Sequence, residues 1–225
     1  MPTDRPSRIP LDRTLVLRAA VTFADNHGIE ALSMRTLASE LGVVPMALYK
    51  HVSDKDDLRG GMIDRVIGEY GTPPASSPSR AAVRLRLLSA REALLRHPWM
   101  RTAIENATRQ TPAVLDHMNA VAGDLISGGH SVDLTHHAMH ALGYRIWGFS
   151  PEAFAAPSAT APREAQPAAM HQMAARYPHV VAIASDAAAR NPEGACDEQA
   201  EYEFTLDLLL DAFERLRDTE WSSTD

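Results

Sequence analysis

The chain has 225 residues, of which 45% are hydrophobic, and a formal net charge of −7 at pH 7. This length and composition allow two compact units with sizeable cores. The single cysteine, Cys196, excludes an internal disulfide framework and any zinc site built from several cysteines. The sequence contains neither a secretion signal nor the run of about 20 apolar residues that a membrane span needs. We therefore expect a soluble, cytoplasmic protein with no membrane partner.

The negative charge is unevenly distributed along the chain. Residues 1–55 carry seven basic and six acidic side chains, a sum of +1, whereas residues 56–225 carry fifteen basic and twenty-three acidic ones, a sum of −8. Both lysines of the chain, Lys50 and Lys55, lie in the first part. An acidic body with a few local cations suits a protein that binds nucleic acid through one limited surface.

Apolar residues recur at spacings of three and four through most of the chain, which predicts an all-α protein. The first helix is predicted to begin at Asp12, a capping residue, and to end at His27. A second, short helix is predicted to follow a cap at Ser33 and to stop at Gly42, whose backbone permits the turn.

A third helix is predicted to begin near Pro45, because proline fits a first helical turn whose amides have no helical partner. Leu48 is expected to face inward, leaving Tyr49, Lys50 and His51 exposed. A phenol, an ammonium and an imidazole on one surface suit contacts with phosphates and base edges. The second and third helices together are predicted to form a helix-turn-helix.

A fourth helix is predicted over residues 53–70, beginning at Ser53 with Asp56 as its capping partner. It is expected to connect two domains. Its two adjacent glycines, Gly60 and Gly61, have two open interpretations: a flexible point of the connector, or weak positions that the helix tolerates.

The remaining chain is predicted to form a helical bundle. We expect a DNA-binding domain of residues 1–70 and a second domain of residues 71–225. The stretch 150–169, rich in proline and alanine, predicts a mobile loop. The further helices are predicted over residues 79–96, 99–109, 112–127, 132–149, 180–190 and 198–218.

Three segments resemble the tetracycline-repressor (TetR) family of regulators. They read Arg-x-Leu-Ala-x-x-Leu-Gly-Val at 35–43, Ala-Leu-Tyr-x-His-Val at 47–52 and Lys-x-x-Leu at 55–58. The resemblance implies an all-α fold with an N-terminal three-helix helix-turn-helix domain and a C-terminal helical-bundle domain for ligand binding and dimerisation. The second half resembles this family more loosely, through residues 94–99, 141–149 and 203–211.

The resemblance implies a homodimer that binds an inverted-repeat operator of double-stranded DNA and represses transcription. Arg35 would reach a guanine edge or a phosphate, and Tyr49, His51 and Lys55 would bind phosphates. The apolar run 44–47 would favour contacts with thymine methyl groups. The DNA-binding residues implied are Arg35, Thr36, Val44, Pro45, Met46, Ala47, Tyr49, Lys50, His51 and Lys55.

The resemblance also implies that a small apolar effector binds the second domain and releases the repressor from DNA. We predict a largely apolar pocket near Tyr144 and Trp147. The run Glu105-Asn-Ala-Thr-Arg lacks the histidine with which tetracycline repressors bind their drug and magnesium, which argues against that ligand. The predicted ligand-binding residues are Met100, Ile104, His117, Val121, His140, Tyr144 and Trp147.

Asp133, His136, His137 and His140 are spaced so that they share one helical face, which could bind a metal or form a pH-sensitive interface. Because no ligand from another part of the chain is evident and the helix belongs to the expected dimer interface, we predict no metal and no cofactor. The chain lacks a phosphate-binding loop, a zinc-protease motif and a nucleophile motif, so we predict that it is not an enzyme. The alternative function is a DNA-binding regulator without a small-molecule ligand, whose C-terminal half serves only dimerisation or a protein partner.

Overall fold

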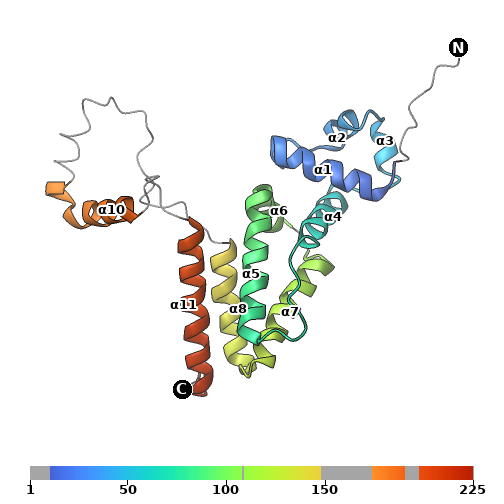
Figure 1. Ribbon diagram of the computed structural model, residues 1–225. Coiled ribbons are helices and arrows are strands. Elements are labelled where there is room, and N and C mark those ends of the chain that lie inside the picture. Colours follow the sequence, from blue (N-terminus) through green and yellow to red (C-terminus); the bar gives the residue numbers. More distant parts are fainter. Residues whose placement is uncertain (1–10, 108, 148–173, 191–197, 225) are drawn as a thin grey trace, which may run out of the picture. The chain divides into compact units, whose positions relative to one another are not determined.

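A computed structural model describes residues 11–107, 109–147, 174–190 and 198–224 (Figure 1). Within these ranges all regular secondary structure is helical, which confirms the all-α prediction. The chain divides into two compact units, one formed by residues up to His140 together with Phe213–Asp225, and the other by Ala141–Ala212. The first unit contains the whole predicted DNA-binding domain and part of the predicted second domain.

The observed helices follow the predicted order closely. The predicted bounds 79–96, 112–127 and 198–218 are those observed, whereas the helix predicted over 99–109 ends at Glu105. The loop predicted over 150–169 lies outside the described residues. The helices are α1 (Arg13–His27), α2 (Met34–Glu40), α3 (Pro45–Leu48), α4 (Lys55–Ile67), α5 (Ser79–Arg96), α6 (Trp99–Glu105), α7 (Pro112–Ser127), α8 (Val132–Trp147), α10 (Pro178–Arg190) and α11 (Glu198–Asp218).

Polar caps fix the starts of the first two helices. The Asp12 carboxylate accepts a hydrogen bond from the Leu15 amide at 2.7 Å and begins α1. At α2, the Ser33 hydroxyl accepts from the Thr36 amide at 3.1 Å, and the Thr36 hydroxyl accepts from the Ser33 amide at 2.9 Å. This reciprocal pair satisfies two amides that the helix itself leaves without partners. The predicted caps at Asp12 and Ser33 are therefore confirmed.

The start of α4 differs from the prediction by one residue. Its cap is Asp54, whose carboxylate accepts from the Asp57 amide at 2.8 Å, and Asp57 in turn accepts from the Ser53 amide at 2.8 Å. The predicted cap at Ser53 with Asp56 as partner is wrong, because the carboxylates at 54 and 57 satisfy the amides of this turn between them.

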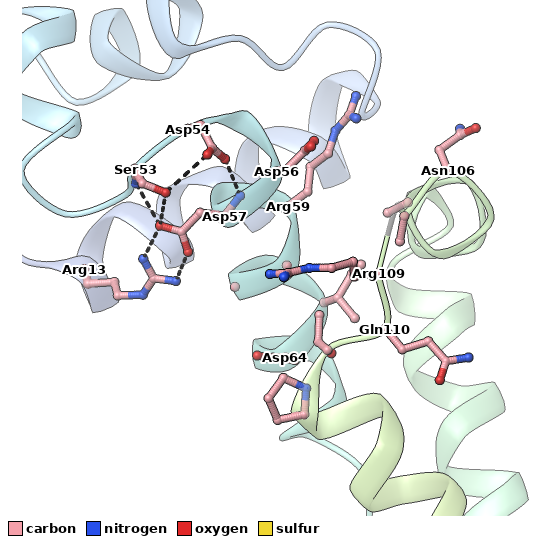
Figure 2. Close-up of a pocket in the computed structure, with 17 residues that line it drawn as sticks. Arg13, Ser53, Asp54, Asp56, Asp57, Arg59, Asp64, Asn106, Arg109 and Gln110 are labelled. Carbon is pink, nitrogen blue, oxygen red and sulfur yellow. Dashed lines mark hydrogen bonds and ion pairs between the residues drawn. The ribbon is translucent and has the colours of Figure 1, made fainter.

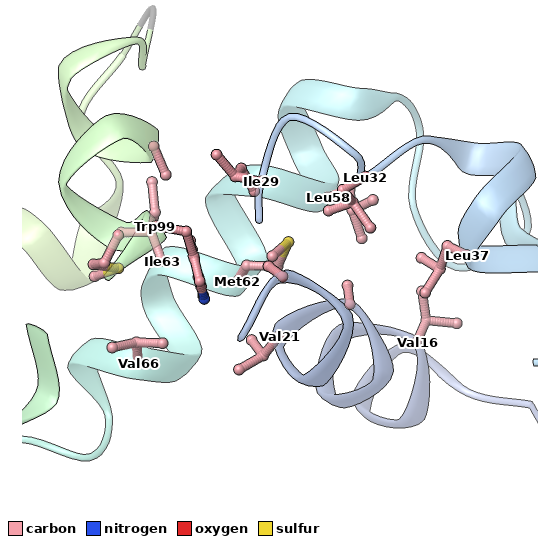
Figure 3. Close-up of a cluster of buried hydrophobic side chains, with 14 of the residues drawn as sticks. Val16, Val21, Ile29, Leu32, Leu37, Leu58, Met62, Ile63, Val66 and Trp99 are labelled. Carbon is pink, nitrogen blue, oxygen red and sulfur yellow. The ribbon is translucent and has the colours of Figure 1, made fainter. Parts of the chain in front are cut away.

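One hydrophobic cluster joins the first four helices to α6. Figure 3 shows Met62 of α4 lying between Val21 of α1 and Trp99 of α6, with Leu58 of α4 beside Leu32. Each large apolar side chain buried in this way contributes roughly 1.5–3 kcal/mol. The helix-turn-helix is thus built on α1 and α4, and α4 also packs on α6. The fully or almost fully buried members include Val16, Ala20, Leu37, Leu48, Leu58, Met62, Ile63, Val66, Ala93 and Met100.

Ion pairs hold the helices that follow α4. Arg86 of α5 donates from Nε to Asp124 of α7 at 2.7 Å, along the most extensive helix pair in the described residues. Arg80 of α5 pairs with Glu214 at 3.4 Å, and Arg217 donates to the Gly128 carbonyl at 3.2 Å. These last two contacts explain why the end of α11 belongs to the first unit.

The two glycines of α4 have different surroundings. A Cβ atom added to Gly61 would lie 2.7 Å from a methyl carbon of Leu17, so the bare backbone at Gly61 allows α1 and α4 to approach closely. A Cβ atom at Gly60 would lie 3.5 Å from the Thr111 side chain, an ordinary contact. Gly61 is therefore a packing residue, which neither of the two sequence-based interpretations anticipated.

We predict that Gly60→Ala raises the free energy of unfolding by about 0.5–1 kcal/mol, because alanine loses less backbone entropy than glycine in a helix interior. Gly61→Ala should not give this gain, since the new methyl group would displace Leu17. Urea unfolding of both variants measures the difference. Equal gains at the two positions would contradict the packing role of Gly61.

Candidate functional site

Helix α3 and the residue before it present apolar side chains to solvent. Val44 is 67% exposed and Met46 is 70% exposed, whereas Leu48 of the same helix is fully buried. Exposed apolar groups on a short helix contribute nothing to the core of the monomer. They suit contact with thymine methyl groups on the floor of the major groove.

Cationic and polar side chains surround this apolar surface. Arg35 on α2, Lys50 after α3 and Lys55 at the start of α4 are exposed, and Tyr49 is 46% exposed. His51 is half-buried. We call this surface, formed by α2, α3 and the start of α4, the reading surface. Of the ten residues predicted to contact DNA, the seven that are exposed are Arg35, Val44, Pro45, Met46, Tyr49, Lys50 and Lys55.

Thr36 has a structural role that the sequence analysis did not assign to it. Its hydroxyl accepts from the Ser33 amide and lies 3.1 Å from the carbonyl oxygens of both Ala31 and Ser33. The hydroxyl hydrogen is thus directed inward, toward the cap of α2. A DNA contact by Thr36 stays a prediction, as do the contacts of the other residues of the reading surface.

Arg13 holds the reading surface to α1. Its guanidinium makes two parallel contacts with Asp57 of α4, at 2.6 Å and 3.0 Å, and also donates to the His51 carbonyl at 2.8 Å. The hydrogen bonds from Arg13 lower the pKa of Asp57 to about 2. Partial burial opposes this shift, and the hydrogen bond from the Ser53 amide adds to it. The sequence analysis missed this pair because the two residues lie 44 positions apart.

A polar cleft of about 520 Å³ lies between α4 and the segment from α6 to α7. Figure 2 shows Arg13 and Asp57 hydrogen-bonded on one side of the cleft, with Arg109 extending toward α4 from the other. Two atoms buried in the lining residues, Nε of Arg59 and Oδ1 of Asp64, have no hydrogen-bond partner. Eleven of the seventeen lining residues are charged or polar, so this cleft differs in character from the apolar pocket predicted near Tyr144 and Trp147, neither of which lines it.

The predicted ligand-binding residues lie in several different surroundings. Met100 is fully buried and Ile104 is half-buried in the hydrophobic cluster that includes α1 and α4, so both serve packing. Val121 is buried, whereas His140 is exposed. The side chains of the two aromatic residues around which the pocket was predicted, Tyr144 and Trp147, lie outside the described part of the structure.

His117, the remaining predicted ligand residue, meets an aromatic residue that the sequence analysis missed. Its ring lies edge-to-face against Tyr70, with 5.0 Å between the ring centroids. Burial raises the pKa of Tyr70 to about 12, and burial together with the nearby Arg86 lowers the pKa of His117. Both groups are therefore neutral near pH 7. The Tyr70 hydroxyl is buried without a hydrogen-bond partner, so it can bond to a polar group that enters this region.

Two residues of the histidine-rich face of α8, Asp133 and His137, contact the end of the chain, although the three histidines of this face are exposed. Asp133 accepts from the Ser223 amide at 2.7 Å and from the Ser223 hydroxyl at 2.9 Å, and these bonds lower its pKa. His137 packs edge-to-face against Trp221, with 5.4 Å between the ring centroids. Among the described residues, no group of three or more histidine, cysteine or acidic side chains is arranged to hold a metal ion. No helix in the same ranges has the length and apolar character needed to cross a membrane.

Two family profiles match the chain. Residues 16–61 match the bacterial regulatory proteins of the tetR family, and residues 80–216 match the tetracyclin repressor-like C-terminal domain. The chain belongs to the TetR family. The first match runs from within α1 to within α4 and includes the whole reading surface, and the second runs from the start of α5 to near the end of α11.

Curated members of the family align with about half of the chain. The HTH-type transcriptional repressor DrrR1 of Streptomyces coeruleorubidus is 36% identical over 129 residues, which are 52% of this chain and 45% of that protein. The tetracycline repressor class D of Escherichia coli is 32% identical over 90 residues, 39% of this chain and 41% of the repressor. The chain thus spans about half the length of the curated relatives it matches.

Solved TetR-family structures share the fold over nearly the whole chain. Apo ActR of Streptomyces coelicolor aligns with a TM-score of 0.69 at 22% identity, over 95% of this chain and 99% of ActR. BioQ, solved with its double-stranded DNA operator, aligns with a TM-score of 0.61 at 22% identity, over 91% of this chain and 98% of BioQ. At this level of identity the comparison establishes the fold alone.

We predict that Asp57→Asn lowers the free energy of unfolding at pH 7 by about 1 kcal/mol, a modest value because the ion pair is partly exposed. The pKa of Asp57 is lower in the folded state than the usual value of about 3.9. The stabilisation of the folded state by the Arg13–Asp57 pair is therefore complete above about pH 4. It should disappear as the pH falls toward 2. Urea unfolding between pH 7 and pH 2 measures this, with the exposed neighbour changed in Asp56→Asn as control. A difference between Asp57→Asn and wild type that does not shrink in acid would contradict the prediction.

We predict that two classes of contact can be separated on the reading surface. Tyr49→Phe or Lys55→Ala should weaken binding to all DNA sequences similarly and flatten the salt dependence, because phosphate contacts carry no sequence information. Arg35→Ala should instead change the preference between sequences. Binding to a panel of DNA duplexes at several salt concentrations measures both effects. Equal changes of specificity in all three variants would contradict this assignment.

Proposed function

We propose that the chain is a transcriptional repressor that binds an inverted-repeat DNA operator as a homodimer and is released by a small molecule. The observation that carries the proposal is the reading surface. Its exposed apolar centre, Val44 and Met46, is bordered by Arg35, Lys50 and Lys55 and stands on a buried core. Sequence-specific DNA recognition has two components, contacts with bases and contacts with phosphates. The apolar centre can supply the first, and the surrounding cations can supply the second.

Dimerisation follows from the size of the reading surface. A helix of four residues is too small to select one operator in a genome, whereas two copies related by a two-fold axis read two half-sites. Exposed apolar side chains on α11 support this proposal, since Phe204 is 62% exposed and Leu208, one helical turn later, is 50% exposed. A second copy of α11 would cover them. The relative BioQ is solved with its double-stranded DNA operator, and DrrR1 is named a repressor.

The effector is proposed to be a small, largely apolar molecule with one polar group. ActR is solved in complex with (S)-DNPA and with actinorhodin, which supports a small-molecule effector for this relative of the same fold. In the present chain, the buried hydroxyl of Tyr70 and the neutral imidazole of His117 could bond such a polar group. The proposed function involves no catalysis, and it places the protein in the cytoplasm with the DNA.

A specific observation favours the alternative function. Met100 and Ile104, two predicted effector contacts, belong instead to the hydrophobic cluster of the DNA-binding helices. If packing is their whole role, the C-terminal half serves only dimerisation or a protein partner. The two functions differ in whether any small molecule changes the affinity for the operator.

We predict that the purified protein protects an inverted repeat in the DNA next to its own gene, and that Tyr49→Ala abolishes the footprint. The reason is that Tyr49 lies exposed at the end of α3, where a phosphate contact fixes the position of the helix. Footprinting at moderate salt measures this. The control Leu115→Ala changes an exposed apolar residue of α7, outside the reading surface and the expected dimer interface, and should leave the footprint intact. Protection of a single half-site only would contradict the homodimer.

A further inference from the structure

A polar junction links the DNA-binding helices directly to α6, with its two ring donors buried and its carboxylates partly exposed. Oδ1 of Asp25, near the end of α1, accepts from Nε1 of Trp99 at 2.6 Å and lies 2.7 Å from Nδ1 of His97. Trp99 is only 5% exposed and His97 is 8% exposed. The Asp25 carboxylate is itself 28% exposed, but both ring nitrogens that face it belong to buried side chains, whose rings are held in one orientation. The two hydrogen bonds are therefore directional.

The same histidine extends the junction to the end of α4. Nε2 of His97 lies 3.3 Å from Oε2 of Glu69, just after α4, and the same oxygen accepts from Nη2 of Arg96 at 3.0 Å. Asp25, Glu69, Arg96, His97 and Trp99 therefore form one connected set, which we call the Asp25 junction. It joins α1, the end of α4, the end of α5 and the start of α6 in one place.

The junction is separate from the reading surface and from the caps of the helix-turn-helix. Asp25 lies near the C-terminal end of α1, whereas Arg13, which holds the reading surface, lies at the N-terminal end of the same helix. The caps of α1 and α2 come from Asp12 and Ser33. These caps and the Arg13 contacts therefore do not involve the Asp25 carboxylate.

Apolar packing alone would leave the angle of the DNA-binding helices poorly fixed. The contacts of Trp99 and Met100 with α1 and α4 are hydrophobic and therefore largely non-directional. Because α4 is fixed to α1, the four DNA-binding helices would move as one body, joined to the rest of the chain covalently only through the end of α4. The hydrogen bonds that Asp25 of α1 accepts from Trp99 and His97 add a second, directional attachment of this body, besides the covalent one after α4. Two attachments remove a rotation that one permits.

We propose that Asp25, His97 and Trp99 are positioning residues that set the angle of the DNA-binding helices, and that they thereby restrict the repressor to operators with one spacing between half-sites. The inference rests on the proposed function, because spacing matters only to a dimer that reads two half-sites. Half-sites lie about 34–36 Å apart, and one extra base pair both lengthens this distance and rotates one half-site around the duplex. An inserted base pair lowers the affinity strongly only if the DNA-binding helices are held at a fixed angle.

The test compares operators that differ by one base pair between the half-sites. Wild-type protein first selects its preferred inverted repeat from a pool of random DNA duplexes. Wild type should then lose about tenfold in affinity or more when one base pair is inserted, whereas Asp25→Asn and Trp99→Phe should lose less than about threefold. Affinity for a duplex with a single half-site should stay within about twofold of wild type in both variants, because the reading surface is unchanged.

The matched control is Glu30→Gln, which removes an exposed carboxylate from the small cleft that Asp25 and Trp99 also line. It should keep the wild-type response to spacing. The inference is overturned if Asp25→Asn retains the tenfold loss, or if half-site affinity falls in parallel with operator affinity in both variants, which would indicate a purely structural role. Failure of the wild-type protein to select any DNA would instead overturn the proposed function, and the inference with it.

Discussion

The close packing of α1 on α4 is the constraint on which the rest of the DNA-binding part depends. Helices α2 and α3 have seven and four residues, too few to be stable alone in water. They are held because Leu37 and Leu48 insert into a core whose floor is α1 and α4. Gly61 lets those two helices approach, and the Arg13–Asp57 pair fixes their register beside the reading surface. A substitution that separates α1 from α4 would therefore remove the packing that holds α3 in place.

The features predicted correctly from the sequence are those that depend on neighbouring residues. The Asp12 and Ser33 caps, the turn at Gly42 and the bounds of α5 and α7 follow from local hydrogen-bonding and from apolar spacing. At α4 the local signal was ambiguous, since several residues that can cap stand side by side, and the prediction missed by one position.

The features that the sequence analysis missed join residues far apart in the chain. Arg13 and Asp57 are separated by 44 positions, and Asp25 and Trp99 by 74. Composition and periodicity contain no information on which acid meets which cation across such distances. The ligand-binding residues could not be predicted reliably for a related reason. A methionine in a core and a methionine in a pocket recur at the same helical spacing, so the sequence could not show that Met100 belongs to the core. Tyr70 is the last residue of a predicted helix, and nothing in the sequence distinguishes its hydroxyl, which is buried without a hydrogen-bond partner, from that of an exposed tyrosine.

The proposed effector contact and the Asp25 junction are adjacent in the chain. Tyr70 follows Glu69 directly, and Glu69 holds His97 through a ring nitrogen. A molecule bonded to the Tyr70 hydroxyl would act one peptide unit from the junction, so a small displacement of that backbone would reach the hydrogen bonds of His97. Under the proposed function, release from DNA would then need no rearrangement of the hydrophobic core, which packs too densely to deform continuously.

The exposure of the apolar centre of the reading surface has an evolutionary consequence. Val44 and Met46 contact mostly solvent, and substitutions at such positions usually change stability by less than about 0.5 kcal/mol. The residues that would choose the DNA sequence are thus energetically separate from those that maintain the fold. Copies of such a gene could acquire new operators by changes at these positions while the supporting helices stay the same, which gives a physical route by which one scaffold can come to control many different promoters.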